Sequence, residues 1–190
     1  MACENLIKGL TAFDCVDAHG GTTGRVILLN FSDIDQATVS IENGAVKSLG
    51  VTKKGVVFQG GPNNSNVGSF SFTPGTYGGG SYSHTVEMRD FKGGPDAYVF
   101  LKQLKNSSVV AIVETKFKGS AGECKYTIYG LESGLVLTTD EGTTEMSDGV
   151  LATLSIATGD GSSEPNRPIN FFTGDLKTTQ EAINDLISAS

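Results

Sequence analysis

The sequence has little of what enzymes and metal proteins require. Its 190 residues include no Trp, only 2 His and only 3 Cys. The cysteines, Cys3, Cys15 and Cys124, form no CxxC pair and are not joined by a spaced set of histidines, which disfavours a metal site. We expect reduced thiols, because disulfides seldom persist in the cytosol; a Cys3 to Cys15 disulfide closing a small N-terminal loop is the less favoured alternative.

Familiar catalytic motifs are also missing. No GxSxG elbow presents a serine nucleophile, and neither a GxxxxGK[ST] loop nor a GxGxxG turn is present for nucleotide phosphates. His19 borders a glycine loop, and His84 lies among apolar residues, which is typical of a packed or interface histidine. We predict that the chain is not an enzyme and carries no cofactor.

Acidic side chains gather in the last third of the sequence without the spacing of a metal loop. They are Asp140, Glu141, Glu145, Asp148, Asp160 and Glu164. Carboxylate oxygens suit calcium, but this spacing fits no EF-hand, so we expect solvated loops.

Charge is sparse and mostly negative. Charged residues make up 18% of the chain, and the formal net charge is -7. This balance repels phosphate backbones and disfavours sequence-specific DNA binding, although it suits the wall of a conduit to which DNA must not stick. No apolar stretch reaches the roughly 18 residues that cross a bilayer, so we expect no membrane partner.

What the sequence has in abundance is strand and turn signals. Its 25 glycines are scattered between apolar runs, as expected of turns. Residues Arg25 to Phe31 predict a buried strand, and Asn43-Gly44 predicts a type I′ turn between two alternating stretches. Further strands are predicted at 56–59, 109–114, 124–131, 135–137 and 150–156. The core elements amount to about nine or ten strands and one helix.

The most informative segment is 67–91, which predicts a long two-faced antiparallel hairpin. Apolar and polar side chains alternate along both halves, with Phe70 and Phe72 on the way in and Tyr82 to Met88 on the way out. The tip is glycine-rich and too flexible to hold one shape alone. We expect this hairpin to contact a neighbouring subunit.

Two helices are predicted. Pro95 begins one whose apolar residues recur at helical spacing up to Leu104, and we expect it to cover one face of a sheet. Near the C-terminus, Thr178 and Glu181 match a capping box before an apolar stripe. A helix of that length is marginal alone, so the stripe must dock on its own domain or on a neighbour. Both alternatives stay open.

Composition changes after the last predicted strand. We therefore divide the chain into a β-rich domain at 1–157 and an extended linker with a short C-terminal helix at 158–190.

The order of elements resembles that of phage tail tube proteins, and in particular of tail-tube-like virion proteins of phages infecting Bacteroidetes. The resemblance rests on the Met-Ala-Cys opening, the Lys8-Gly9-Leu10 step, the helix running into Leu104 to Glu114, the segment Lys125 to Leu137, and the strand Leu151 to Ile156 leading to Glu164-Pro165. It covers most of the chain and involves no invariant motif.

The resemblance implies a fold and a function. The fold is mainly β, a β-sandwich or split barrel with one covering α-helix and a short C-terminal helix. The function is structural: copies form hexameric rings that stack into the tail tube of the virion, after synthesis in the host cytoplasm. Its partners are further copies of itself and other tail proteins, and DNA passes through without sequence recognition.

On this basis we predict a subunit interface on the hairpin and the C-terminal helix. Its candidate residues are Phe70, Phe72, Tyr77, Gly79, Tyr82, His84, Val86, Met88, Ile183, Leu186 and Ile187.

Two alternatives remain besides an enzyme of unrecognised type, which is disfavoured because no coherent set of acid, base and nucleophile is present. One is another virion part, such as a head-to-tail connector, a capsid decoration protein or a fibre base, because similar β folds serve all of these. The other, less favoured, is a carbohydrate- or cell-surface-binding β-sandwich in which Tyr77 and Tyr82 supply a stacking surface.

Overall fold

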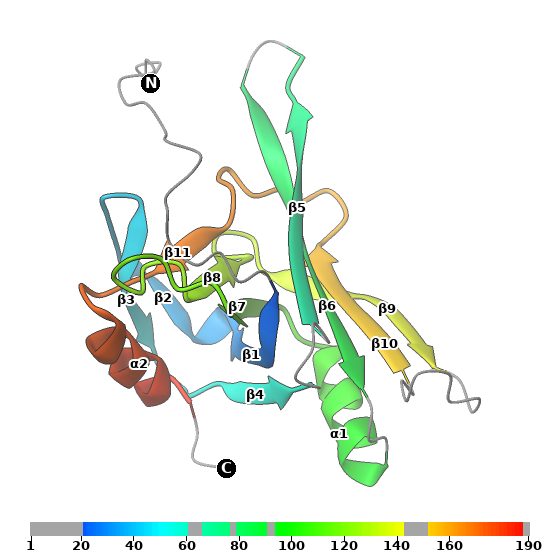
Figure 1. Cartoon of the computed structure of the whole chain (residues 1–190). Helices are drawn as coiled ribbons and strands as arrows, with labels where there is room; N and C mark the ends of the chain where they lie inside the picture. Colours follow the sequence, from blue (N-terminus) through cyan, green and yellow to red (C-terminus); the bar gives the residue numbers. More distant parts are fainter. Residues whose placement is uncertain (1–20, 61–65, 77–78, 91–93, 143–151, 188–190) are drawn as a thin grey trace.

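The structure is a computed structural model that describes residues 21–60, 66–76, 79–90, 94–142 and 152–187 (Figure 1). The chain is mainly β with two helices, as the sequence predicts. Predictions that concern Cys3, Cys15, His19 and Tyr77 lie outside the described residues.

The described strands and helices lie between Thr22 and Asp185. The first half holds β1 (Thr22–Asn30), a 3-10 turn (Phe31–Asp33), β2 (Ile34–Glu42), β3 (Ala45–Val51), β4 (Val56–Gln59), β5 (Asn66–Pro74) and β6 (Gly80–Asp90). The second half holds α1 (Pro95–Leu104), β7 (Val109–Thr115), β8 (Tyr126–Tyr129), β9 (Leu135–Gly142), β10 (Ala152–Thr158), β11 (Ile169–Phe171) and α2 (Leu176–Asp185).

The strands form one sheet that folds into two layers. Their order is β2-β3-β11-β8-β7-β9-β10-β6-β5, and β1 pairs with both β7 and β4. Only the pair Val109↔Leu135 joins β7 to β9, and the sheet changes layer at this point. β1, β7 and β8 make the central layer, and β9, β10, β6 and β5 make the second layer beside it (Figure 1).

The central layer is buried on both faces, which explains its continuous apolar runs. One face carries Ile27 and Ile112 into a cluster with α2 and the β2–β3 hairpin. The other face carries Val26 and Val113 against the second layer. Helix α1 adds Leu104 to this second cluster and confirms the prediction that it covers a sheet.

The C-terminal segment belongs to the same body. Strand β11 lies between β3 and β8, pairing in parallel with the first and antiparallel with the second. The sequence predicts only extended linker here, so this strand was missed. Helix α2 places Ile183 and Leu186 in the core, at 0% and 6% exposure. Of the two alternatives for its apolar stripe, the structure shows docking on its own chain.

Two local predictions can be compared with the backbone. The Asn43-Gly44 turn has positive φ at both residues, 51° and 75°, as a type I′ turn requires. The capping prediction for α2 is wrong: the N-cap is Asp175, whose Oδ1 accepts from the backbone N–H of Thr178 at 3.0 Å. The helix therefore begins before Thr178, which lies in its first turn.

Candidate functional site

The β5–β6 hairpin is the most prominent surface feature, because it rises well above the body (Figure 1). Its strands pair continuously from Asn66↔Met88 to Pro74↔Gly80. The sequence predicts this hairpin, and the structure confirms it.

The base of the hairpin is built into the core. Val86 and Met88 are completely buried, in the cluster between the two layers. The Asn66 side-chain amide donates to the carbonyl of Gly24 at 2.6 Å, which ties β5 to β1. The ring of Tyr129 lies against Gly68, where a Cβ would collide with it. The side chains of the lower half of this face are therefore packed within their own chain.

The same face continues past the body, and there its aromatic side chains are uncovered. Phe70 and Phe72 are 44% and 52% exposed. Both pack against Tyr82, with ring centroids at 6.1 Å and 5.1 Å. The guanidinium of Arg167 lies over the Phe70 ring, 5.1 Å from its centroid. The face that packs into the core at the base of the hairpin is thus exposed at the top, where Phe70, Phe72 and Tyr82 form an aromatic ridge.

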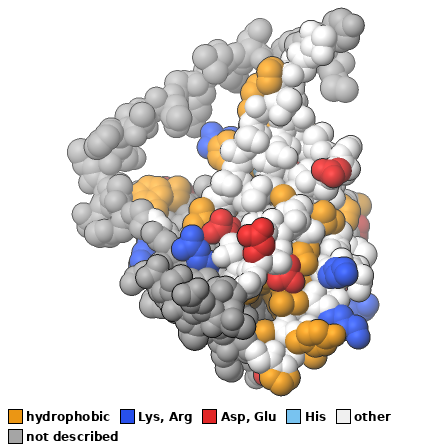
Figure 2. Space-filling view, turned by 90° about the vertical axis from the view of Figure 1, so that its right-hand side faces the viewer, with side chains coloured by type: hydrophobic (Ala, Val, Ile, Leu, Met, Phe, Trp, Pro, Cys, Tyr) orange, Lys and Arg blue, Asp and Glu red, His pale blue; other side chains and the backbone are white. Residues whose placement is uncertain are grey.

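The opposite face of the projecting part carries small hydroxyl side chains. Its cross-strand pairs are Ser69↔Thr85, Ser71↔Ser83 and Thr73↔Ser81. Residues 55–86 contain no Asp, Glu, Lys or Arg at all. In Figure 2 the upper hairpin accordingly shows mainly uncharged polar and hydrophobic surface. The projecting element has no fixed charge of its own with which to bind phosphate or metal.

A loop after β10 clasps the hairpin where it leaves the body. The backbones of Tyr82 and Glu164 exchange two hydrogen bonds, of 2.8 Å and 2.9 Å. The Glu164 carboxylate is 1% exposed and accepts from the backbone N–H groups of Glu132 and Ser133, at 3.1 Å and 2.9 Å. This clasp links β6 to the turn between β8 and β9.

His84 completes the clasp from within. Its Nδ1 accepts from the backbone N–H of Gly130 at 3.1 Å, and its Nε2 lies 3.0 Å from the carbonyl of Asn166. This pairing assigns the proton to Nε2 and makes the ring neutral. Burial lowers the pKa of His84 below 6.5, while the Glu164 carboxylate and the Asn166 carbonyl act in the opposite direction. Both ring nitrogens serve the fold, as the packed interpretation predicts.

The candidate interface residues therefore lie in three different settings. Phe70, Phe72 and Tyr82 form the exposed ridge, and Gly79 lies at the tip with a φ of 73°. His84, Val86, Met88, Ile183 and Leu186 are buried within their own chain, and half-buried Ile187 packs beside them. The buried residues are not at the surface that a neighbour would meet. The clasp through Glu164 was not predicted, because nothing in the local sequence marks this acid as buried. The contact of Arg167 with Phe70 was not predicted either.

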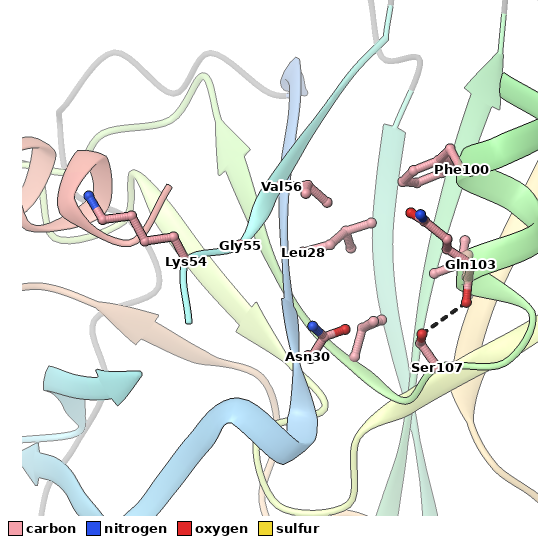
Figure 3. Close-up of a pocket in the computed structure, with 10 residues that line it drawn as sticks. Leu28, Asn30, Lys54, Gly55, Val56, Phe100, Gln103 and Ser107 are labelled. Carbon is pink, nitrogen blue, oxygen red and sulfur yellow. Dashed lines mark hydrogen bonds between the residues drawn. The ribbon is translucent and has the colours of Figure 1, made fainter. Parts of the chain in front are cut away.

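A second feature lies at the other end of the molecule, between α1 and the start of β4 (Figure 3). It is a pocket of about 120 Å³. Its lining residues are Leu28, Asn30, Lys54, Gly55, Val56, Phe100, Gln103, Leu104, Ser107 and Val109. Leu28, Leu104 and Val109 are core residues that form an apolar floor, and the amides and the Ser107 hydroxyl lie nearer the rim.

The described residues contain no group of three or more His, Cys, Asp or Glu side chains that could hold a metal ion. Of the acids considered for calcium, Asp140 and Glu141 are exposed on β9, and Glu164 is used by the clasp. Glu145 and Asp148 lie outside the described residues.

Neither helix in the described part of the chain has the length and apolar character needed to cross a membrane.

No protein-family model, no curated protein and no solved structure matches this chain.

Proposed function

We propose that the chain is a structural virion protein whose copies assemble into stacked, hexameric rings that form a phage tail tube. The observation that carries the proposal is the continuation of the core-facing side of the hairpin into an exposed aromatic ridge. Exposed Phe70 and Phe72 on a charge-free strand are costly in water, and burial against another subunit removes that cost.

The sheet edges support assembly independently. Within the described residues, β5 pairs only with β6, and β2 pairs only with β3. Each edge strand is nine residues long and leaves a row of backbone N–H and C=O groups without a described strand beside it. Such edges invite pairing with another chain, and a closed ring satisfies them without open-ended aggregation.

The surface chemistry fits a conduit for DNA. The hydroxyl face of the hairpin presents neither cations that would retain phosphate nor acids in excess, and the net charge of the whole chain is -7. A wall of this kind allows a polyanion to pass without sequence-specific binding.

Electron microscopy and sedimentation of the purified full chain test this proposal. We expect rings that stack into tubes at high protein concentration. The double variant Phe70→Ser, Phe72→Ser should fold normally but fail to assemble, whereas Val136→Ser, which removes an apolar side chain that is 36% exposed on β9, should assemble like the wild type. Persistent monomers, or trimers that coat a capsid lattice, contradict the proposal; the latter outcome favours a decoration protein.

One specific feature of the ridge supports the carbohydrate-binding alternative. Three aromatic rings lie together beside Arg167, an arrangement that can stack against a sugar. Glycan-array binding by a stable monomer, lost in Phe72→Ser, would favour this second function over the tube.

A further inference from the structure

Exposed apolar side chains gather at two opposite ends of the described structure. One group is the hairpin ridge, with Phe70 and Phe72. The other lies around α1 and β4, where Val56, Tyr98 and Val99 are 51%, 68% and 53% exposed. Figure 1 places the ends of β5 and β6 that carry the ridge toward the top of the molecule and α1 with β4 toward the bottom, and Figure 2 shows hydrophobic side chains at both ends.

The pocket between α1 and β4 opens within the second group. In Figure 3, Val56 and Phe100 face it from opposite sides, above the Leu28 floor. Its volume of about 120 Å³ approaches that of cavities of about 150 Å³ that bind benzene. The size and the apolar floor therefore suit one aromatic ring.

The pocket suits a neutral occupant. Lys54 is the only charged residue among those that line it, and in Figure 3 its side chain extends away from Val56 and Phe100. No charged side chain drawn there points at the apolar floor, so burial of an uncharged, apolar group is favoured.

We propose that this pocket receives the Phe72 end of the hairpin from a second copy of the chain. The inference rests on the proposed function and specifies how one copy, or one ring, meets the next. The hairpin offers an exposed phenyl ring on a charge-free strand, which matches a pocket whose floor is apolar and into which the Lys54 side chain does not point.

The position of the two surfaces determines the kind of assembly. Because the hairpin end and the pocket are different surfaces at opposite ends of one chain, their contact is head-to-tail. Each copy that donates its hairpin still has a free pocket, so the contact repeats along an axis. Stacking of rings is the expected result.

A pair of complementary variants tests this inference in the full-length protein. Phe72→Glu places a charge on the hairpin and leaves the pocket intact, and Val56→Glu does the reverse. Both positions are about half exposed, so both variants should fold. Val136→Glu adds the same charge at an exposed position on β9 and serves as the control for charge alone.

Sedimentation velocity should show that neither variant stacks alone, while Val136→Glu stacks like the wild type. An equimolar mixture of Phe72→Glu and Val56→Glu should give a discrete species of twice the mass of either variant, because one intact hairpin meets one intact pocket and the assembly then ends. A hairpin-to-hairpin contact predicts instead that Val56→Glu assembles normally, which would overturn the inference and leave the proposed function standing. Wild-type protein that never assembles would overturn both.

A photo-crosslink gives an independent readout. With p-benzoylphenylalanine in place of Phe72, irradiation of assembled protein should link the hairpin of one copy to peptides from 95–109 or 54–56 of another. Links confined to β5 or β6 peptides of the second copy would contradict the pocket as the docking site.

Discussion

The imidazole of His84 accepts a hydrogen bond from the backbone amide of Gly130, through Nδ1 at 3.1 Å. The geometry requires an unprotonated Nδ1, because an imidazolium ring has two donors and no acceptor. The projecting hairpin is thus joined to the turn between β8 and β9 by a bond that exists only with a neutral histidine.

Stability should therefore depend on pH in the range where histidine titrates. Burial lowers the pKa of His84 in the folded state, so the unfolded chain binds a proton that the folded chain does not. The free energy of unfolding should be highest above pH 6.5 and should decrease as the pH falls below that value, by at most about 1.4 kcal/mol per pH unit for one proton. Urea denaturation between about pH 5 and pH 8, the range in which histidine changes its charge, measures this slope.

His84→Gln keeps a neutral acceptor for the Gly130 amide and should flatten the slope. His19→Gln is the matched control and should leave the contribution of His84 in place. If His84→Gln retains the full slope, the titrating group lies elsewhere.

The buried carboxylate of the clasp should be sensitive to a change of one atom. In Glu164→Gln one oxygen becomes an NH₂ group that faces a backbone N–H of Glu132 or Ser133. Loss of an acceptor at this buried position should lower the free energy of unfolding by about 1–3 kcal/mol. Glu132→Gln makes the same change on an exposed side chain and should have little effect. Equal unfolding midpoints for the two variants would contradict the clasp.

The contact between Gly68 and Tyr129 should not tolerate a methyl group. A Cβ at position 68 would collide with the Tyr129 ring, which His84 also contacts edge-on at 5.8 Å between centroids. We expect Gly68→Ala to lower the free energy of unfolding by about 1–3 kcal/mol. Gly159→Ala is the matched control, because its Cβ would meet Val136 Cγ2 at an ordinary 3.5 Å. Calorimetry that finds the two variants equally stable would argue against this packing.

Helix α2 should stabilise the isolated subunit. Ile183 is fully buried in its own chain, so Ile183→Ala should cost about 2–5 kcal/mol in the unfolding of the monomer. Asn184→Ala, on the exposed side of the helix, should be nearly neutral. An Ile183→Ala variant that unfolds like the wild type as a monomer would mean that the helix docks on a neighbour instead.

The sequence predicts elements whose side chains follow a strong local pattern. The β-branched run at 109–114 became β7, and Pro95 with its apolar spacing became α1. The alternating segment forms the β5–β6 hairpin with the two faces that the sequence predicts, because period-two patterning determines which side chains share a face.

The local sequence pattern does not show at which residue a strand leaves the body of the protein and becomes exposed. Val86 and Phe72 lie on the same face of the hairpin, yet one is completely buried and the other is half exposed. The difference comes from distant residues that cover the lower half, such as Tyr129 against Gly68 and the core cluster around Val86. The sequence alone therefore does not show which candidate interface residues lie on the exposed ridge and which are buried in the core.

Two other features were not predicted from the sequence, for similar reasons. Strand β11 is three residues long and follows Pro168, so its pairing with β3 and β8 is decided by tertiary contacts. Asp175 and Thr178 are both good N-cap residues, and the local spacing to Glu181 favoured the wrong one. Only the observed bond from the Thr178 N–H to Asp175 distinguishes them.

The absence of Asp, Glu, Lys and Arg from residues 55–86 has a thermodynamic consequence for the hairpin. A contact made by such a segment gains little from Coulombic attraction, so added salt should hardly weaken it. Apolar burial loses driving force on cooling. Copies joined through the hairpin should therefore hold together across a wide range of ionic strength and separate more readily in the cold.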